Sequence, residues 1–105
     1  MKHLKIETED GAVIEYRYKD VEQLKGLLPR WKEIEIGCNV QLGDNIVLGE
    51  DVWMGDDCII GNNVRIGRGV VVGNNVEIEA WCTVYPDVHI NDNAHLPLGA
   101  NVTGE

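Results

Sequence analysis

The chain has 105 residues, enough for one domain, and its twelve glycines, lack of phenylalanine and abundance of Val and Ile favour strands over packed helices. The net charge of −9 lies entirely in residues 34–105, which hold eleven Asp/Glu and two Lys/Arg, so we do not expect the protein to bind nucleic acid. No apolar run approaches the ~18 residues of a membrane helix, and no apolar signal segment opens the chain, so we expect a cytoplasmic protein that does not enter a membrane.

Residues 1–33 begin with a pattern that predicts a β-hairpin. Apolar side chains alternate on both sides of the loop Glu9-Asp10-Gly11. A loop of this length opposes Ile6 to Ile14 on one face, whereas a two-residue turn would oppose Ile6 to a glutamate. The longer loop therefore gives the better register.

A short helix is predicted after the hairpin. Asp20 and Gln23 have the spacing of a capping box, and Pro29 ends the helix. We expect the hairpin and helix, residues 1–33, to form a small cap on the domain that follows, with Trp31 closing its core.

From residue 34 the sequence is a repeat. It divides into twelve hexapeptides without insertion: IEIGCN, VQLGDN, IVLGED, VWMGDD, CIIGNN, VRIGRG, VVVGNN, VEIEAW, CTVYPD, VHINDN, AHLPLG and ANVTGE. The first and third positions are apolar in every hexapeptide, and the fourth is glycine in the first seven. Such self-similarity is typical of a stacked repeat architecture.

Each position of the hexapeptide has a physical reading. Apolar, variable, apolar is a three-residue strand whose side chains point in, out and in. The sixth position is mostly Asn, Asp or Gly, which adopt a left-handed conformation at low cost. Glycine at the fourth position lets the chain bend close to its neighbour. The sequence therefore predicts an all-β coil of short parallel strands around aliphatic columns.

On these repeats the chain resembles the hexapeptide-repeat proteins, whose fold is the left-handed parallel β-helix. The resemblance implies three hexapeptides per coil, hence about four coils over residues 34–105, with residue i stacked on residue i+18. The outward residues then form three columns: Glu35, Trp53, Val71 and His89 on a first face; Gln41, Ile59, Glu77 and His95 on a second; Val47, Arg65, Thr83 and Asn101 on a third.

Within this family, one branch is matched more closely. Asp51-Val52-Trp53-Met54-Gly55 resembles the DVWIG segment of the maltose, galactoside and xenobiotic acetyltransferases, and residues 94–104 resemble the segment that ends their helical domain. In that branch acetyl-CoA lies in a groove between subunits of a trimer, and a histidine acts as general base. The resemblance implies a homotrimeric, CoA-dependent acyltransferase that acts on a small hydroxyl or amine.

Histidines are the candidates for the general base, because a near-neutral imidazole suits proton abstraction. The only histidine before the DVWMG segment is His3, in the hairpin. His89, which Asp87 or Asp92 would orient, is the first candidate, and His95 the second. Contacts to the cofactor are expected from Trp53 and from two arginines, Arg65 and Arg68.

We predict no metal site. A γ-class carbonic anhydrase needs three histidine ligands on zinc, but His89 and His95 project from adjacent faces and diverge. Stacked Asp and Asn residues at the corners offer oxygen atoms to Ca²⁺, although stacked turns explain them more simply. Three cysteines without a CxxC pair indicate reduced thiols, and Cys58 and Cys82 occupy inward positions as core residues.

Several features favour association into a homo-oligomer. Trp53, Val71 and Ile59 face outward, and four coils leave an open end lined by Ile90, Leu96 and Val102. Apolar residues also replace turn residues in the last two coils: Trp81, Tyr85, Pro86 and Leu98. A non-catalytic oligomeric scaffold or binding module is therefore the alternative to the acyltransferase.

Overall fold

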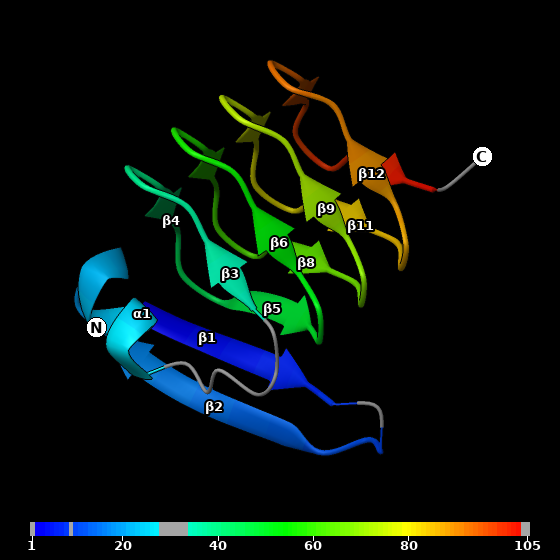
Figure 1. The fold of residues 1–105 in the computed structure, drawn as a ribbon. Coiled ribbons are helices and arrows are strands. Elements are labelled where there is room, and N and C mark those ends of the chain that lie inside the picture. Colours follow the sequence, from blue (N-terminus) through cyan, green and yellow to red (C-terminus); the bar gives the residue numbers. More distant parts are fainter. Residues whose placement is uncertain (1, 9, 28–33, 104–105) are drawn as a thin grey trace.

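The computed structural model describes residues 2–8, 10–27 and 34–103. Twelve short strands form a parallel β-solenoid of about four turns, consistent with a left-handed β-helix, and a hairpin with one short helix closes one end (Figure 1). The predicted fold class is thereby confirmed. No helix in the described ranges has the length and apolarity needed to cross a membrane.

The strands of the solenoid run in three sheets. The first-face strands are β3 (Glu35–Ile36), β6 (Trp53–Met54), β9 (Val71–Val72) and β12 (His89–Ile90); the second-face strands are β4 (Gln41–Leu42), β7 (Ile59–Ile60), β10 (Glu77–Ile78) and β13 (His95–Leu96); the third-face strands are β5 (Ile46–Gly49), β8 (Arg65–Ile66), β11 (Thr83–Val84) and β14 (Asn101–Val102). Each pairs in parallel with the strand 18 residues away, as in Trp53 opposite Val71. The three predicted columns are therefore correct.

The core is a continuous stack of aliphatic side chains. The residues at the first and third positions of the hexapeptides are buried through most of the solenoid. Cys58 and Cys82 are buried with them as free thiols, as the sequence predicts, and burial raises the pKa of the Cys58 thiol. The inward residues Ile36, in the first coil, and Leu96 and Val102, in the last, are partly exposed. Ile90, the third residue expected at the open end, is instead 5% exposed.

The corners adopt the left-handed conformation at the sixth position of each hexapeptide. Positive φ occurs there at Asn39, Asn45, Asp51, Asp57, Asn63, Gly69, Asn75, Trp81, Asp87, Asn93 and Gly99. Trp81 (φ 66°) differs from the others, which are all Asn, Asp or Gly, because a bulky aromatic residue seldom adopts this conformation. The geometry of the coil therefore fixes the backbone even where the residue type does not favour it.

Polar side chains at the fifth position bind adjacent coils together. The Oδ1 atoms of Asp56, Asn74 and Asp92 accept the backbone N–H groups of Cys38, Asp56 and Asn74, at 2.8, 2.8 and 2.7 Å. The stacked corner carboxylates thus have a structural role. In the part of the chain that the structure describes, no group of three His, Cys, Asp or Glu side chains is placed to hold a metal ion.

The N-terminal hairpin joins β1 (Lys2–Glu7) to β2 (Val13–Tyr18), with Ile6 opposite Ile14 as predicted. The sequence does not predict its partner: β1 also pairs in parallel with β5, so the hairpin extends the sheet of the third face by two strands. Leu4 and Ile6 are fully buried in the same core as the solenoid. The hairpin is therefore a continuation of one sheet as well as a cover on the first coil.

Helix α1 (Val21–Leu27) begins at the predicted capping box. Asp20 Oδ1 accepts the Gln23 N–H at 2.9 Å, and Gln23 Oε1 accepts the Lys19 N–H at 2.6 Å. Leu24 is fully buried in the shared core. The proposed roles of Pro29 and Trp31 lie outside the described residues.

Tyr18 makes the stability of this cap sensitive to alkali. Its side chain is buried and its hydroxyl donates to the Gly43 carbonyl at 2.8 Å; burial, and then the Asp44 charge, raise the pKa of Tyr18 from 10.0 to about 12. Folding thus favours the protonated phenol. The stabilisation that the Tyr18 phenol gives the folded protein is complete below pH 10. It is lost as pH rises through the pKa of Tyr18 in the folded state.

Comparison with Tyr18→Phe tests this. At pH 7 the variant is expected to be less stable by about 1 kcal/mol, because it loses the hydrogen bond to Gly43. Urea unfolding at a series of pH values should show this gap narrowing between pH 10 and 12, since phenylalanine has no proton to lose. A gap that stays constant over that range would contradict the assignment.

Candidate functional site

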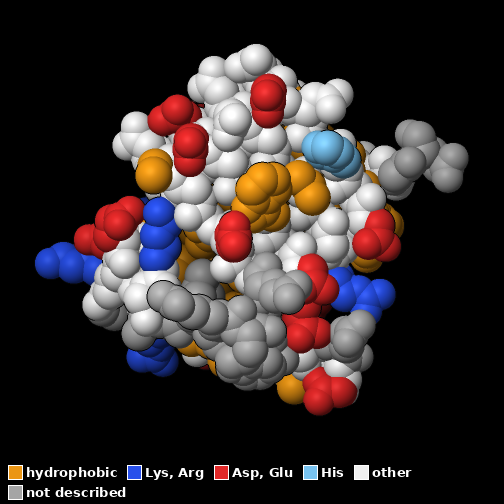
Figure 2. Space-filling model, in the orientation of Figure 1, with side chains coloured by type: hydrophobic (Ala, Val, Ile, Leu, Met, Phe, Trp, Pro, Cys, Tyr) orange, Lys and Arg blue, Asp and Glu red, His pale blue; other side chains and the backbone are white. Residues whose placement is uncertain are grey.

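The first face carries a groove. It has a volume of about 390 Å³, and the outward column Glu35, Trp53, Val71 and His89 runs along it. The two-residue strands β3, β6, β9 and β12 hold these side chains at successive levels. Figure 2 shows an apolar patch on this side of the molecule, with a histidine beside it and acidic side chains around it. The structure thus brings the predicted Trp53 and His89 together.

Trp53 is the central apolar group of the groove. Its side chain is 51% exposed, and its indole Nε1 donates to Glu35 Oε2 at 2.6 Å. This hydrogen bond fixes the ring against the first coil. Asp56 and Asp92 also line the groove. The groove therefore combines an exposed aromatic surface with a negative potential.

His89 is exposed and lies opposite Val71 in the parallel register. It shares the groove with Asp92, one of its two predicted orienting residues. Within the described ranges no hydrogen bond joins His89 to Asp87 or Asp92, and Asp92 Oδ1 instead accepts the Asn74 N–H. The imidazole is thus accessible from the groove without a fixed carboxylate partner.

The other two histidines lie elsewhere. His95 is on the second face, where Nε2 lies 2.6 Å from Glu79 Oε2. His3 is on the hairpin; its backbone N–H donates to Asp44 Oδ1 at 2.7 Å, which together with the nearby imidazole lowers the pKa of Asp44. The three histidines therefore do not converge on one point.

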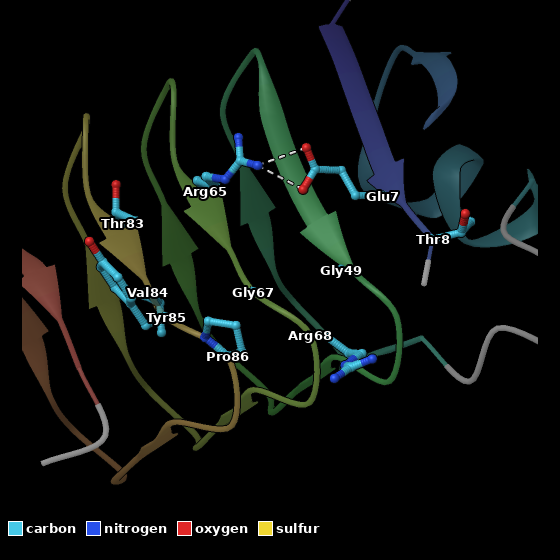
Figure 3. A pocket seen from close by; sticks show the side chains of 10 residues that line it. All are labelled: Glu7, Thr8, Gly49, Arg65, Gly67, Arg68, Thr83, Val84, Tyr85 and Pro86. Atoms are coloured by element: carbon cyan, nitrogen blue, oxygen red, sulfur yellow. Dashed lines mark hydrogen bonds and ion pairs between the residues drawn. The ribbon is translucent and has the colours of Figure 1, made fainter. Parts of the chain in front are cut away.

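Both arginines of residues 34–105 line a second groove, on the side of the third face (Figure 3). We call this groove the arginine trough. It has a volume of about 600 Å³ and is bordered by Glu7, Arg65, Arg68, Thr83, Tyr85 and Pro86. Arg65 Nη2 lies 2.8 Å from both carboxylate oxygens of Glu7. An ion pair thus joins the hairpin to the solenoid at the trough.

The structure does not bring the three predicted cofactor residues together within one chain. Trp53 faces out from β6 on the first face, whereas Arg65 faces out from β8 on the third. Their joint contact with acetyl-CoA stays a prediction. The sequence reasoning missed Glu7 as a neighbour of Arg65, because nothing in the alternation of the hairpin shows which strand it pairs with.

Exposed apolar residues gather on the last two coils as the sequence suggests. Trp81 is 64% exposed and Leu98 is 65% exposed, and Tyr85 and Pro86 are also exposed. Asn63, Trp81 and Gly99 stack at one corner, so Leu98 lies one coil above Ala80, next to Trp81. Tyr85 and Pro86 border the arginine trough instead.

A family model described as bacterial transferase hexapeptide (six repeats) matches residues 33–68, about a third of the chain. Among curated proteins and solved structures, none matches the chain significantly. Residues 34–68 of the matched segment lie in the first two coils, from β3 to β8. The match places hexapeptide repeats in these two coils, and the parallel solenoid of about four turns is the architecture expected of such repeats.

Proposed function

We propose that the protein is a small acyltransferase that takes an acyl group from acetyl-CoA and transfers it to a hydroxyl or amine, working as a homotrimer. The observation that carries this proposal is the shared groove of Trp53 and His89 on the first face. An accessible imidazole beside an exposed aromatic surface is an arrangement suited to general-base chemistry on a small acceptor.

Acetyl-CoA, when bound, supplies the acyl group as a thioester. Carboxylates of Glu35, Asp56 and Asp92 line the groove, so the phosphates of CoA do not fit there, whereas its uncharged arm suits the exposed Trp53 ring. The arginines that suit phosphates lie on the third face, and a neighbouring copy would have to present them. This is the physical reason for proposing an oligomeric site.

His89 has one task in this proposal. Its imidazole accepts the proton of the acceptor hydroxyl or amine as that group attacks the thioester carbonyl carbon. The C–S bond then breaks, and the imidazolium gives the proton to the departing thiolate, so that CoA leaves as the free thiol. Trp53 provides a surface that excludes water from one side of the groove. General-base catalysis of this kind contributes about 10²- to 10⁴-fold to the rate.

The test begins with a thermal melt of the protein in acetyl-CoA, after light scattering has measured its oligomeric state. A ligand that binds the folded state adds about 2.7 kcal/mol at a hundredfold excess over Kd, so the melting temperature should rise. Trp53→Ala should abolish the rise. His89→Ala should keep the rise but lower turnover by about 10²-fold or more, because the base acts on the acceptor.

His95→Ala is the comparison variant, since it removes an exposed histidine from another face. Loss of turnover in His95→Ala instead of His89→Ala would move the base to the second face. A trimer whose melting temperature does not respond to millimolar acetyl-CoA would contradict the acyltransferase proposal.

A second candidate function is a non-catalytic oligomeric scaffold. The observation in its favour is the exposed pair Trp81 and Leu98, because large exposed apolar side chains usually mark an interaction surface. The same measurement separates the two: an oligomer that does not bind acetyl-CoA is expected of the scaffold.

A further inference from the structure

The arginine trough differs in chemistry from the rest of the solenoid. Residues 34–105 carry eleven acidic side chains, yet their two arginines both border this groove. Among the described residues that line the trough, the one acidic side chain is that of Glu7, which comes from the hairpin. A ligand in the trough therefore meets the one part of the solenoid where positive side chains gather.

Arg65 is held over the trough rather than folded away. Glu7 and Gly49 are opposite each other, as are Val47 and Arg65, so the Glu7–Arg65 pair spans β5 beside Gly49, which has no side chain to block it. Both carboxylate oxygens contact the same atom, Nη2. A guanidinium has five N–H donors, so the contact orients Arg65 and leaves donors for a second acceptor.

The side of the trough away from Glu7 carries Tyr85 and Pro86 (Figure 3). Tyr85 and Pro86 stand one coil above Gly67 and Arg68, where earlier coils have turn residues. Both residues are exposed, and both line the groove. The trough thus holds an aromatic ring and two arginines in one groove, a combination on which a flat ring stacks while its phosphates extend toward the guanidinium groups.

We propose that the arginine trough binds a small phosphorylated molecule that carries a flat ring, such as a nucleotide, with its phosphates on Arg65 and Arg68 and its ring on Tyr85. The volume of about 600 Å³ falls within the range of small-molecule sites. The proposed acyltransferase would place the phosphates of CoA on the same arginines of a neighbouring copy. The trough is nevertheless complete within one chain and lies on a different face from Trp53 and His89, so ligand binding there is measured apart from acyl transfer.

The experiment is a titration of the ¹⁵N-labelled protein with ADP, followed by amide chemical shifts. The saturable shifts should map to Gly67, Arg68 and Tyr85. ADP should bind more tightly than pyrophosphate, which lacks the ring, and more tightly than adenosine, which lacks the phosphates. Arg68→Gln should weaken ADP binding by about tenfold or more, since it removes a charge-assisted contact.

Two further variants sharpen the result. Tyr85→Ala should weaken ADP about tenfold and leave pyrophosphate unchanged, because it removes only the stacking surface. Arg17→Gln is the matched control: it changes the net charge equally, but Arg17 is exposed on β2, opposite His3 and away from the trough. It should bind ADP as the wild type does.

A third ligand identifies the source of the phosphorylated ring. Acetyl-CoA binding more tightly than ADP to the trough would assign the nucleotide part of CoA, whereas tighter binding of ADP would assign a free nucleotide. The proposal is overturned if ADP causes no saturable shifts in the wild-type protein, if the shifts map away from the trough, or if Arg17→Gln weakens binding as much as Arg68→Gln. None of these outcomes depends on turnover, so the acyltransferase proposal can fail while ligand binding in the trough is confirmed.

Discussion

Ile60→Asp is expected to abolish folding. Ile60 is 2% exposed and lies in β7, with Leu42 in the coil below and Ile78 in the coil above. A carboxylate placed there has no partner, and burial of an unpaired charge costs at least several kcal/mol. A domain of this size is stable by only about 5–15 kcal/mol, so most or all of its stability would be lost. Circular dichroism and urea unfolding measure the effect.

The neighbouring residue supplies the control. Ile59 belongs to the same strand but points outward and is 45% exposed. Ile59→Asp adds the same charge one residue away. In a monomeric preparation its free energy of unfolding should lie within about 0.5 kcal/mol of that of the wild type. Wild-type-like melting of Ile60→Asp, or equal unfolding of both variants, would show that the alternation of inward and outward residues is assigned wrongly.

The fold of the solenoid could be predicted because the residue types at each position of the hexapeptide indicate the local conformation. Apolar residues at the first and third positions define the inward side, and the sixth position marks the corner. Even Trp81, an unusual residue for a left-handed conformation, follows the repeat. The pairing of strands 18 residues apart then follows from three hexapeptides per coil, and it placed Trp53 and His89 in one column.

The hairpin shows what a sequence pattern leaves open. Alternation over residues 2–7 predicts a strand and its turn predicts the partner β2, because both are local. Its parallel pairing with β5 joins residues about 40 positions apart, and no periodicity encodes that distance. The contact of Glu7 with Arg65 depends on that pairing. The side of the arginine trough that the hairpin forms could therefore not be predicted from the sequence.

The grooves could not be predicted from the sequence, for a more general reason. A column of outward residues fixes the Cα positions, but the volume of a groove depends on where the side chains lie and which of them pair. Hydrogen bonds to glutamates hold two of the exposed rings: Glu35 holds Trp53, and Glu79 holds His95. The sequence ranks His89 and His95 by column alone, whereas the structure separates them by their partners.

The fourth position of the hexapeptide gives the second large effect. Gly61→Ala is expected to destabilise the protein by about 1–3 kcal/mol, because a Cβ at this position would lie 2.7 Å from the Ala80 backbone nitrogen and 3.0 Å from the Glu79 carbonyl carbon. Both atoms belong to the next coil, whose spacing is fixed by backbone hydrogen bonds such as that from the Gly61 N–H to the Ile78 carbonyl at 2.7 Å. The backbone cannot move away without breaking that ladder.

Gly26→Ala provides a contrast of opposite sign in the same chain. Gly26 lies in α1, its φ is not positive, and an added Cβ would meet nothing within 4 Å. Alanine there restricts the unfolded chain at no steric cost, so a gain of about 0.5 kcal/mol is expected. Urea unfolding midpoints of the two variants should therefore move in opposite directions. If Gly61→Ala matched Gly26→Ala, the coils would not be stacked as closely as the glycines at the fourth position imply.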